Sequence, residues 1–473
     1  MSKKSDEKTR IESDLLGEIE VPINAYYGVQ TQRAIANFAI SKQKLADYPA
    51  FIKGLALVKW AAAKTNYELQ LLDSTIYQAI ETACKELVAG QFHQDFPIDM
   101  IQGGAGTSTN MNANEVIANR VLEILGHAKG EYQYCSPNDH VNLSQSTNDA
   151  YPTAFKVALF EMNQRVVLAL TSLVQALEEK EIAFQDILKM GRTQLQDAVP
   201  MTLGQEFGAF AFTLAREINK LEEASQAFLE INMGATAIGT GLNAVPGYAT
   251  LCAQHLGELM QQPVVSAANL IEATSDTSGL VAYSNALKKV AIKLSKMCND
   301  LRLLSSGPRT GLAEIQLPAM QPGSSIMPGK VNPVIPEVVN QVCFKVIGND
   351  MTITMASEAA QLQLNVMEPV LVHSLMESME WMIQAMDTLN EKCIQGIQAN
   401  ADHTKEQVLQ SIGIVTALNP YIGYKASTKI AKEALETGKG VYDLILAHQL
   451  MTKEQLDELL DPKHMLAPHG VAK

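Results

Sequence analysis

Apolar side chains in the middle of the chain recur at steps of three and four residues, which is the repeat of one face of an α-helix. Three such stripes extend over residues 159–177, 287–304 and 375–389. Stripes of this length predict long helices that pack at shallow angles in a bundle. The stripes consist of Leu159, Met162, Val166, Leu170, Leu173 and Leu177, then Leu287, Val290, Leu294, Met297, Leu301 and Leu304, then Leu375, Met379, Met382, Met386 and Leu389.

The rest of the chain has shorter and more mixed patterns. Residues 17–25 predict a short strand or hairpin, and helices are expected at about 50–90 and 112–125. Thr202 and Gln205 have the spacing of a capping box, so a further helix should begin near Thr202. The last part of the chain carries short helical patterns that proline and glycine interrupt.

These patterns together predict an all-α protein in three parts. Its long helices carry more apolar surface than a single bundle needs to bury, so we expect several copies to associate into a larger helical core. The expected parts are a mixed, mostly helical segment over residues 1–146, a long-helix bundle over 147–399 and a small helical segment over 400–473.

Composition excludes several classes of protein. The 37 basic and 51 acidic side chains give a net charge of -14 without a local basic cluster, so nucleic acid is not an expected partner. No uninterrupted apolar run reaches the roughly 18 residues of a membrane span. Residues 1–10 are polar, which predicts a flexible tail and not a signal peptide. The six cysteines include no C-x-x-C pair, so we expect reduced thiols, neither disulfides nor a zinc site, and a soluble, cytoplasmic protein.

Four segments between the predicted helices are rich in hydroxyl and amide side chains, and each is expected to precede a helix start. Asn112, Asp149 and Asn332 are the candidate N-cap residues. Any one such segment could be an ordinary turn. Together they suggest a receptor for a small polyanion, because helix N-termini offer free N–H groups and partial positive charge. The segments are residues 103–110, 144–149, 191–197 and 323–333.

The last of these segments, Gly323-Ser-Ser-Ile-Met-Pro-Gly-Lys-Val-Asn-Pro333, resembles the signature of the fumarase/aspartase superfamily. The other three fall where that superfamily has its remaining active-site regions, so the resemblance covers essentially the whole chain. It implies the three-domain helical fold of that superfamily and a lyase that needs no metal or organic cofactor. It also implies a homotetramer in which each of the four active sites takes residues from three subunits.

Within the superfamily the polar segments are most similar to the aspartate ammonia-lyases, which reversibly remove ammonia from L-aspartate to give fumarate. Ser146-Thr-Asn148 and Asn365-Val-Met-Glu368 are typical of that branch, whereas fumarases usually carry Ser-Ser-Asn and a lysine near position 368. Fumarases and some aspartases have histidine where this chain has Gln194. Glutamine cannot titrate, so Gln194 suits a site that holds an ammonium group or an amine by hydrogen bonds.

The resemblance assigns a role to each candidate residue. Taking a proton from the carbon next to a carboxylate gives an aci-carboxylate with a second negative charge, which preorganised donors must stabilise. Ser324 is expected to be the general base, and Lys330 a second catalytic residue that helps to activate it. Substrate contacts are expected from Thr107, Ser146, Thr147 and Ser325 to the reacting carboxylate, from Lys330, Asn332 and Thr193 to the other carboxylate, and from Asn148 and Gln194 to the amino group.

Two other functions stay open at this point. The first is fumarate hydratase, which shares the superfamily's motif. The second is a non-catalytic helical scaffold, against which the intact set of Ser324, Lys330 and Asn332 argues. Relatives that cleave argininosuccinate or adenylosuccinate need room for a larger leaving group and usually carry a histidine near position 194, so they are disfavoured.

Overall fold

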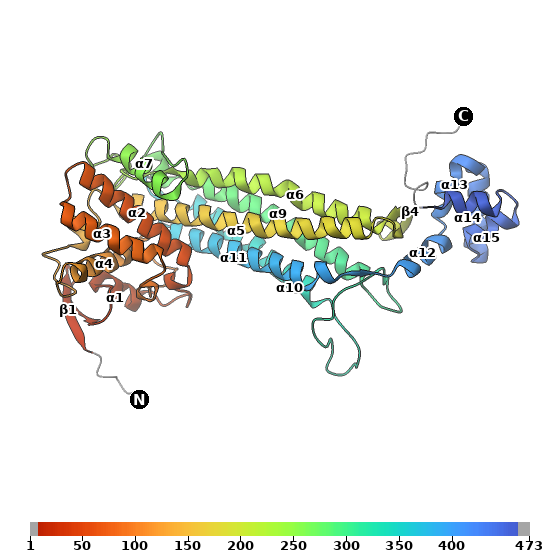
Figure 1. Ribbon diagram of the computed structural model, residues 1–473, viewed down its shortest axis with the longest axis horizontal. Coiled ribbons are helices and arrows are strands. Elements are labelled where there is room, and N and C mark those ends of the chain that lie inside the picture. The colour runs from red at the N-terminus through yellow and green to blue at the C-terminus, as the bar shows by residue number, and fades with distance from the viewer. Residues whose placement is uncertain (1–7, 462–473) are drawn as a thin grey trace. The chain divides into compact units, whose positions relative to one another are not determined.

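The computed structural model describes residues 8–461, and helices make up 62% of it (Figure 1). Residues 1–7, which include most of the expected tail, and residues 462–473 lie outside the described part. The helical content confirms the all-α class. Strands pair only in two-stranded sheets within residues 8–461: β1 (Thr9–Asp14) with β2 (Gly17–Pro22), β3 (Leu188–Thr193) with β4 (Gln196–Thr202), β5 (Glu230–Ile231) with β6 (Val265–Ser266), and β7 (Ile315–Gln316) with β8 (Gln398–Ala399).

The described chain divides into two compact units that are each assembled from separate stretches of sequence. Unit 1 comprises residues 8–167, 219–289 and 345–381, and unit 2 comprises residues 168–218, 290–344 and 382–461. Each of the five long helices contributes a segment to both units. The three-part division expected from the sequence stays a prediction. The long helices are α5 (Thr147–Ala183), α6 (Leu203–Ser225), α9 (Ser278–Leu304), α10 (Val334–Glu358) and α11 (Glu368–Lys392).

The apolar stripes predicted in these long helices are buried. None of the stripe residues exceeds 5% exposure. Polar pairs also join the helices inside each unit. In unit 1, Tyr283 of α9 donates to Asn163 of α5 over 2.8 Å, and in unit 2, Asn340 of α10 donates to Ser295 of α9 over 2.9 Å. Because buried polar groups need such partners, these bonds help to fix the register in which the helices pack.

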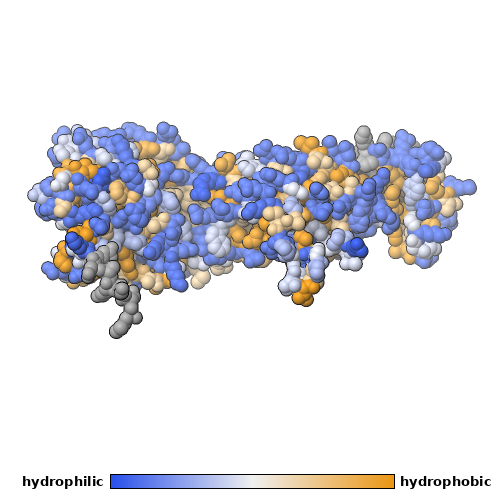
Figure 2. All heavy atoms as spheres, turned by 60° about the horizontal axis from the view of Figure 1, so that its bottom comes forward, coloured by the Kyte–Doolittle hydropathy of each residue, from blue (hydrophilic) through white to orange (hydrophobic). Residues whose placement is uncertain are grey.

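Apolar side chains are also grouped at the surface, as Figure 2 shows for one face of the molecule. One outer stripe on α10 consists of Phe344, Ile347, Met351 and Met355, whose exposed fractions range from 36% to 65%. α5 is long and apolar enough to cross a membrane, but 61% of its most apolar window is buried, and core helices pass the same test. We therefore interpret α5 as a core helix.

Unit 1 also contains the shorter helices of the N-terminal part and the hairpin β1–β2, which confirms the hairpin predicted near residue 17. The buried Glu115 carboxylate accepts N–H groups of Gly28, Gln30 and Thr31, where the first helix begins. Burial raises the pKa of Glu115 to about 7. These helices are α1 (Val29–Asn37), α2 (Pro49–Glu68), α3 (Ser74–Val88), α4 (Thr107–Ile124), α7 (Tyr248–Met260) and α8 (Glu272–Ser275).

Unit 2 ends in five short helices that share one hydrophobic core with strand β3. Val408, Ile414 and Ile445 are among its buried residues, and Leu188 and Met190 of strand β3 belong to the same cluster. The C-terminal helices therefore pack on the strand that leads into the third polar segment. They are α12 (Ala401–Gln410), α13 (Ile414–Ile422), α14 (Tyr424–Thr437), α15 (Val441–Ala447) and α16 (Lys453–Leu459).

Helix capping follows the sequence in part. The capping box of Thr202 and Gln205 is confirmed at the start of α6. Asn112 is not an N-cap, because α4 begins at Thr107 and Asn112 is buried within it, donating to the Asp95 carbonyl. Asp149 lies in the first turn of α5, where its carboxylate accepts the N–H of Ser146, and the Asn332 amide donates to the Gly323 carbonyl instead of capping α10.

The contact between α2 and α5 should be intolerant of any added side chain at Gly54. A Cβ atom there would lie 2.3 Å from the Ala154 carbonyl oxygen, which is backbone of a long helix and cannot move aside. We expect Gly54→Ala to lower the free energy of unfolding by about 1–3 kcal/mol, measured by urea-induced unfolding.

A matched control is Lys53→Ala, which removes the half-exposed ion pair of Lys53 with Glu161 across the same two helices. Such a pair contributes less than about 1 kcal/mol. Equal effects of the two substitutions would contradict close backbone packing at Gly54.

Candidate active site

The first two polar segments meet in unit 1. Thr107 opens α4, and its hydroxyl donates to the Gly104 carbonyl over 2.7 Å. One turn further along α4, the amide of Asn110 donates to the hydroxyl oxygen of Thr147 over 3.2 Å, where α5 begins. The two helix N-termini are therefore neighbours, as expected for a site that gathers N–H groups and hydroxyls around an anion.

Gly106 sets the position of the first segment. Its φ of +86° is unfavourable for residues with a side chain. A Cβ atom on Gly106 would also lie 2.5 Å from the ring of Tyr151, which is buried in α5. The glycine thus allows the start of α4 to rest directly on α5, behind the exposed Thr107.

The buried side chain of Asp149 holds the second segment in place. The buried carboxylate accepts backbone N–H groups of Ser146, Gly234 and Thr236, and burial raises its pKa to about 6. The neighbouring Asn148 donates its amide N–H to the carbonyl of Ala237 over 2.7 Å. This bond orients the amide group and leaves its Oδ1 atom able to accept a hydrogen bond.

The third segment precedes α6 as expected, but it forms a β-hairpin turn between β3 and β4, which the sequence pattern did not predict. Thr193 ends β3, and Gln194 and Leu195 form the turn with φ values of 55° and 63°. Both residues adopt left-handed backbone conformations, which hairpin turns usually assign to asparagine and glycine. The sequence Gln-Leu therefore gave no turn signal.

A buried charge cluster anchors this hairpin in unit 2. The Glu314 carboxylate, which is fully buried, pairs with Lys189 over 2.7 Å and with Arg192. Lys189 also pairs with Glu206 at the start of α6. Because both basic residues belong to β3, the cluster holds the strand directly before Thr193 and Gln194.

The fourth segment, residues 323–333, is a loop that closes on itself. The Gly323 N–H donates to the Lys330 carbonyl over 2.8 Å, and the Asn332 amide donates to the Gly323 carbonyl over 2.7 Å. Between these two bonds, the hydroxyl oxygen of Ser324 accepts the backbone N–H groups of Ile326 and Met327 at 3.2 and 3.0 Å. Ser325 and Lys330 are exposed, as the side chains of a substrate loop would be.

The candidate residues thus fall into two sets. Unit 1 brings Thr107, Ser146, Thr147 and Asn148 together, and unit 2 carries Thr193 and Gln194 on its hairpin and Ser324, Ser325, Lys330 and Asn332 on its loop. Sequence reasoning missed Lys59, which is fully buried beneath the unit 1 set. A single lysine within the apolar stretch of residues 55–63 was the available signal.

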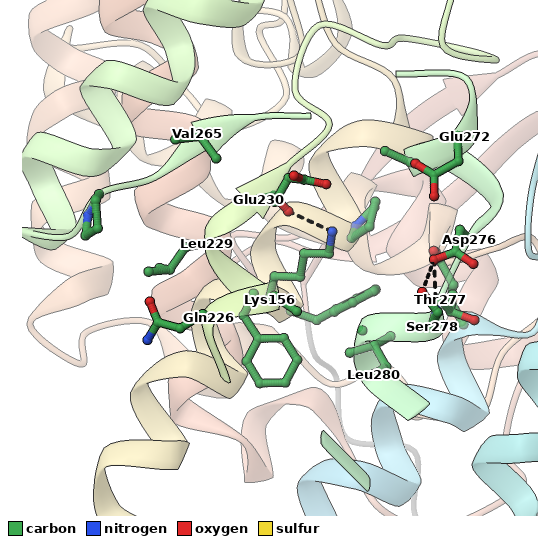
Figure 3. A pocket seen from close by; sticks show the side chains of 18 residues that line it. Lys156, Gln226, Leu229, Glu230, Val265, Glu272, Asp276, Thr277, Ser278 and Leu280 are labelled. Carbon is green, nitrogen blue, oxygen red and sulfur yellow. Dashed lines mark hydrogen bonds between the residues drawn. The ribbon is translucent and has the colours of Figure 1, made fainter. Parts of the chain in front are cut away.

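A separate cavity of about 420 Å³ lies within unit 1 and contains none of the candidate residues (Figure 3). Lys156 lines it and donates to the carbonyl of Glu230 over 2.8 Å. Glu368, from the motif typical of one branch of the superfamily, lines it too, and its Oε2 atom is buried without a hydrogen-bond partner. Burial raises the pKa of Glu368 to about 8, and the charge of Lys156 opposes this shift.

Comparison with known proteins gives matches over nearly the whole chain. A family described as "Lyase" matches residues 17–348, and one described as "Fumarase C C-terminus" matches residues 414–467. The aspartate ammonia-lyase of Pseudomonas canavaninivorans is 57% identical to this chain over 463 residues, which cover 98% of each protein.

Solved structures give the same result for the fold. A fumarate lyase:delta crystallin of Brucella melitensis has a TM-score of 0.95 and 50% identity, covering 98% of this chain and all of that one. The class II fumarase of Schistosoma mansoni has a TM-score of 0.90 but 35% identity, covering 98% of this chain and all of that one.

The buried carboxyl of Glu368 should make stability depend on pH. Its pKa is about 8 in the folded protein, against 4.5 for an ordinary glutamate. Between these values the folded protein keeps a proton that the unfolded chain has lost, so stability falls as the pH rises through this window. Glu368→Gln removes that loss. The free energy of unfolding of the variant minus that of the parent should therefore rise by about 1–3 kcal/mol between about pH 5 and about pH 8. Urea-induced unfolding at both pH values measures this difference.

Glu272→Gln is the control, because Glu272 lines the same cavity but is exposed. Its free energy of unfolding should change between about pH 5 and about pH 8 by the same amount as that of the parent protein. A Glu368→Gln variant with the parent's pH dependence would show that Glu368 is ionised in the folded protein.

Proposed function

The chain belongs to the fumarase/aspartase superfamily of lyases, and from this premise we propose that it is an aspartate ammonia-lyase, which converts L-aspartate reversibly to fumarate and ammonia. The observation that carries the proposal is the complete loop 323–333, with the Ser324 oxygen held by two backbone N–H groups. The identity of 57% with an aspartate ammonia-lyase, against 35% with a fumarase, favours ammonia over water as the leaving group.

The reaction begins with removal of a proton from the carbon next to the β-carboxylate. We assign the base to Ser324, whose hydroxyl is too weak an acid to ionise unaided. The N–H groups of Ile326 and Met327 that its oxygen accepts would stabilise the alkoxide, and the charge of Lys330 would add to this effect when substrate is bound. The base takes the proton, and the electron pair of the C–H bond moves into the carboxylate.

The resulting aci-carboxylate carries two negative charges and needs fixed donors. Thr107, Ser146, Thr147 and Ser325 are assigned to it, and the Thr107 hydroxyl hydrogen would turn from the Gly104 carbonyl to the substrate. The Thr147 oxygen already accepts a bond from Asn110, so its single hydrogen is free to point at the substrate. Each donor of this kind contributes on the order of a hundred- to a thousandfold in rate, because it stabilises the charge that appears in the transition state.

The remaining groups hold the other end of aspartate. Lys330, Asn332 and Thr193 are assigned to the α-carboxylate, and Asn332 keeps a second amide hydrogen for it while bonding to Gly323. Asn148 and Gln194 accept hydrogen bonds from the α-ammonium group. The electron pair held by the aci-carboxylate then forms the C=C bond of fumarate as the C–N bond breaks. The electrons of the C–N bond stay on nitrogen, so neutral ammonia leaves and this step requires no general acid.

We further propose that four copies of the chain form the working enzyme, with three subunits contributing to each site. The exposed apolar stripe of Phe344, Ile347, Met351 and Met355 supports this, because monomers rarely expose long apolar stripes.

The six cysteines are all free and buried, which suits a reducing cytoplasm.

The function is tested by following the absorbance of fumarate in the presence and absence of ammonium. We expect fumarate to be consumed only with ammonium, giving aspartate, because the site holds an amine by neutral amide groups and has no titratable residue at position 194. Malate formation as the dominant reaction would identify a fumarate hydratase, and no reaction in either mixture would favour a non-catalytic scaffold.

The role of Ser324 is tested by Ser324→Ala, which should lower kcat at least about a thousandfold while leaving the protein folded. Ser305→Ala, a substitution of the same kind near the end of α9, should leave kcat unchanged. Turnover by Ser324→Ala at more than a tenth of the parent rate would remove Ser324 from the role of base.

Co-expression of Ser324→Ala with Thr147→Val tests whether two subunits contribute to one active site. If Thr147 and Ser324 come from different subunits, mixed tetramers regain activity in about a quarter of their sites, because each site draws its two parts at random. Failure to regain activity would place both residues in one subunit.

A further inference from the structure

Lys59 is a buried cation without a carboxylate partner. It lies in α2 at 0% exposure, and its three ammonium hydrogens meet three amide oxygens. These are Oδ1 of Asn110 at 2.7 Å, Oδ1 of Asn142 at 3.1 Å and Oε1 of Gln145 at 2.8 Å. Neutral amides satisfy the hydrogen bonds but do not cancel the charge, so the positive potential of Lys59 extends into its surroundings.

The carboxylate whose charge acts on Lys59 forms its hydrogen bonds elsewhere. Asp149 acts on the ammonium through its charge, but its oxygens accept the N–H groups of Ser146, Gly234 and Thr236. Burial lowers the pKa of Lys59 to about 7, and the charge of Asp149 opposes the shift. A buried ammonium group held only by neutral amides costs free energy in the empty protein, and an anion bound nearby would offset that cost.

Each amide around Lys59 is held in one orientation by a second set of bonds. Gln145 donates to the Val141 and Leu143 carbonyls, and Asn142 donates to the Gln145 carbonyl. Asn110 donates to the Thr147 hydroxyl. Lys59 therefore fixes the oxygen end of these amides, and their N–H ends fix the turn that presents Ser146 and Thr147.

We propose that Lys59 is the positioning residue of the carboxylate-binding set in unit 1. Through Asn110 it keeps the Thr147 oxygen occupied as an acceptor, so that the Thr147 hydrogen is directed to the substrate. It also supplies fixed positive charge beneath the group that gains a second negative charge. This assignment rests on the proposed elimination reaction only for its effect on kcat, because an unreactive dicarboxylate would be bound by the same set.

The experiment compares the full-length parent protein with Lys59→Met, which keeps an unbranched side chain of nearly the same length and removes its charge. We expect kcat for aspartate to fall at least about a hundredfold, while binding of succinate measured by calorimetry weakens about tenfold. The larger effect on kcat follows because the charge that Lys59 faces increases in the transition state. A merely structural role would lower the amount of folded protein and leave kcat per folded molecule unchanged.

Lys64→Met is the matched control, since Lys64 lies on the same helix and forms a partly exposed pair with Glu258. It should change kcat and succinate affinity less than twofold. If Lys59→Met does not fold, Asn110→Asp gives the decision. This substitution keeps an oxygen that accepts from Lys59 but removes the amide N–H that donates to the Thr147 hydroxyl. We expect kcat to fall about tenfold or more.

Parent-like kcat and succinate affinity in folded Lys59→Met, or in Asn110→Asp where Lys59→Met does not fold, would overturn the assignment. If the parent protein binds succinate but does not turn over aspartate, the proposed function fails. In that case, succinate binding that is tenfold weaker in Lys59→Met than in the parent still supports the role of Lys59. Equal succinate affinity of the two proteins contradicts that role.

Discussion

A carboxylate that takes up a second negative charge is stabilised best by donors that already point at it, because donors that must reorient lose part of their effect. This constraint accounts for the density of buried amides and hydroxyls around the starts of α4 and α5. Gly106 allows the start of α4 to rest on α5, Asp149 holds the turn before α5, and Asn110 joins the two segments. The proposed chemistry depends on this prearranged set more than on any single acid or base.

The unit 2 residues are held in a different way. Thr193 and Gln194 sit on a tight turn whose strand is fixed by the buried carboxylate of Glu314. Ser324 sits on an exposed loop that is closed by its own backbone and by Asn332. A rigid set of donors in unit 1 and a self-contained loop that carries Ser324 and Ser325 would let the base approach substrate without disturbing the unit 1 donors.

Much of the fold could be predicted because its cause is local. The stripes of leucine and methionine predicted α5, α9 and α11, and the pair of Thr202 and Gln205 marked the start of α6. The four polar segments were also visible in the sequence, because hydroxyl and amide side chains are concentrated in them. The motif of residues 323–333 is in addition long and specific. What these patterns could not give was the hairpin at Gln194, where tertiary contacts around Glu314 stabilise a turn that its residues do not favour. Nor could they give the surroundings of Lys59, because Asn110, Asn142 and Gln145 reach it from distant positions.

The shared core of the C-terminal helices and strand β3 has a consequence for how related enzymes could diverge. Helices α12–α16 contain none of the candidate residues, yet Val408 and Ile414 pack in one cluster with Leu188 and Met190, a few residues before Gln194. Changes of volume in that remote core would tilt the strand and move the amide that is proposed to hold the leaving group. Substrate preference could therefore drift through substitutions in a segment that never touches a substrate.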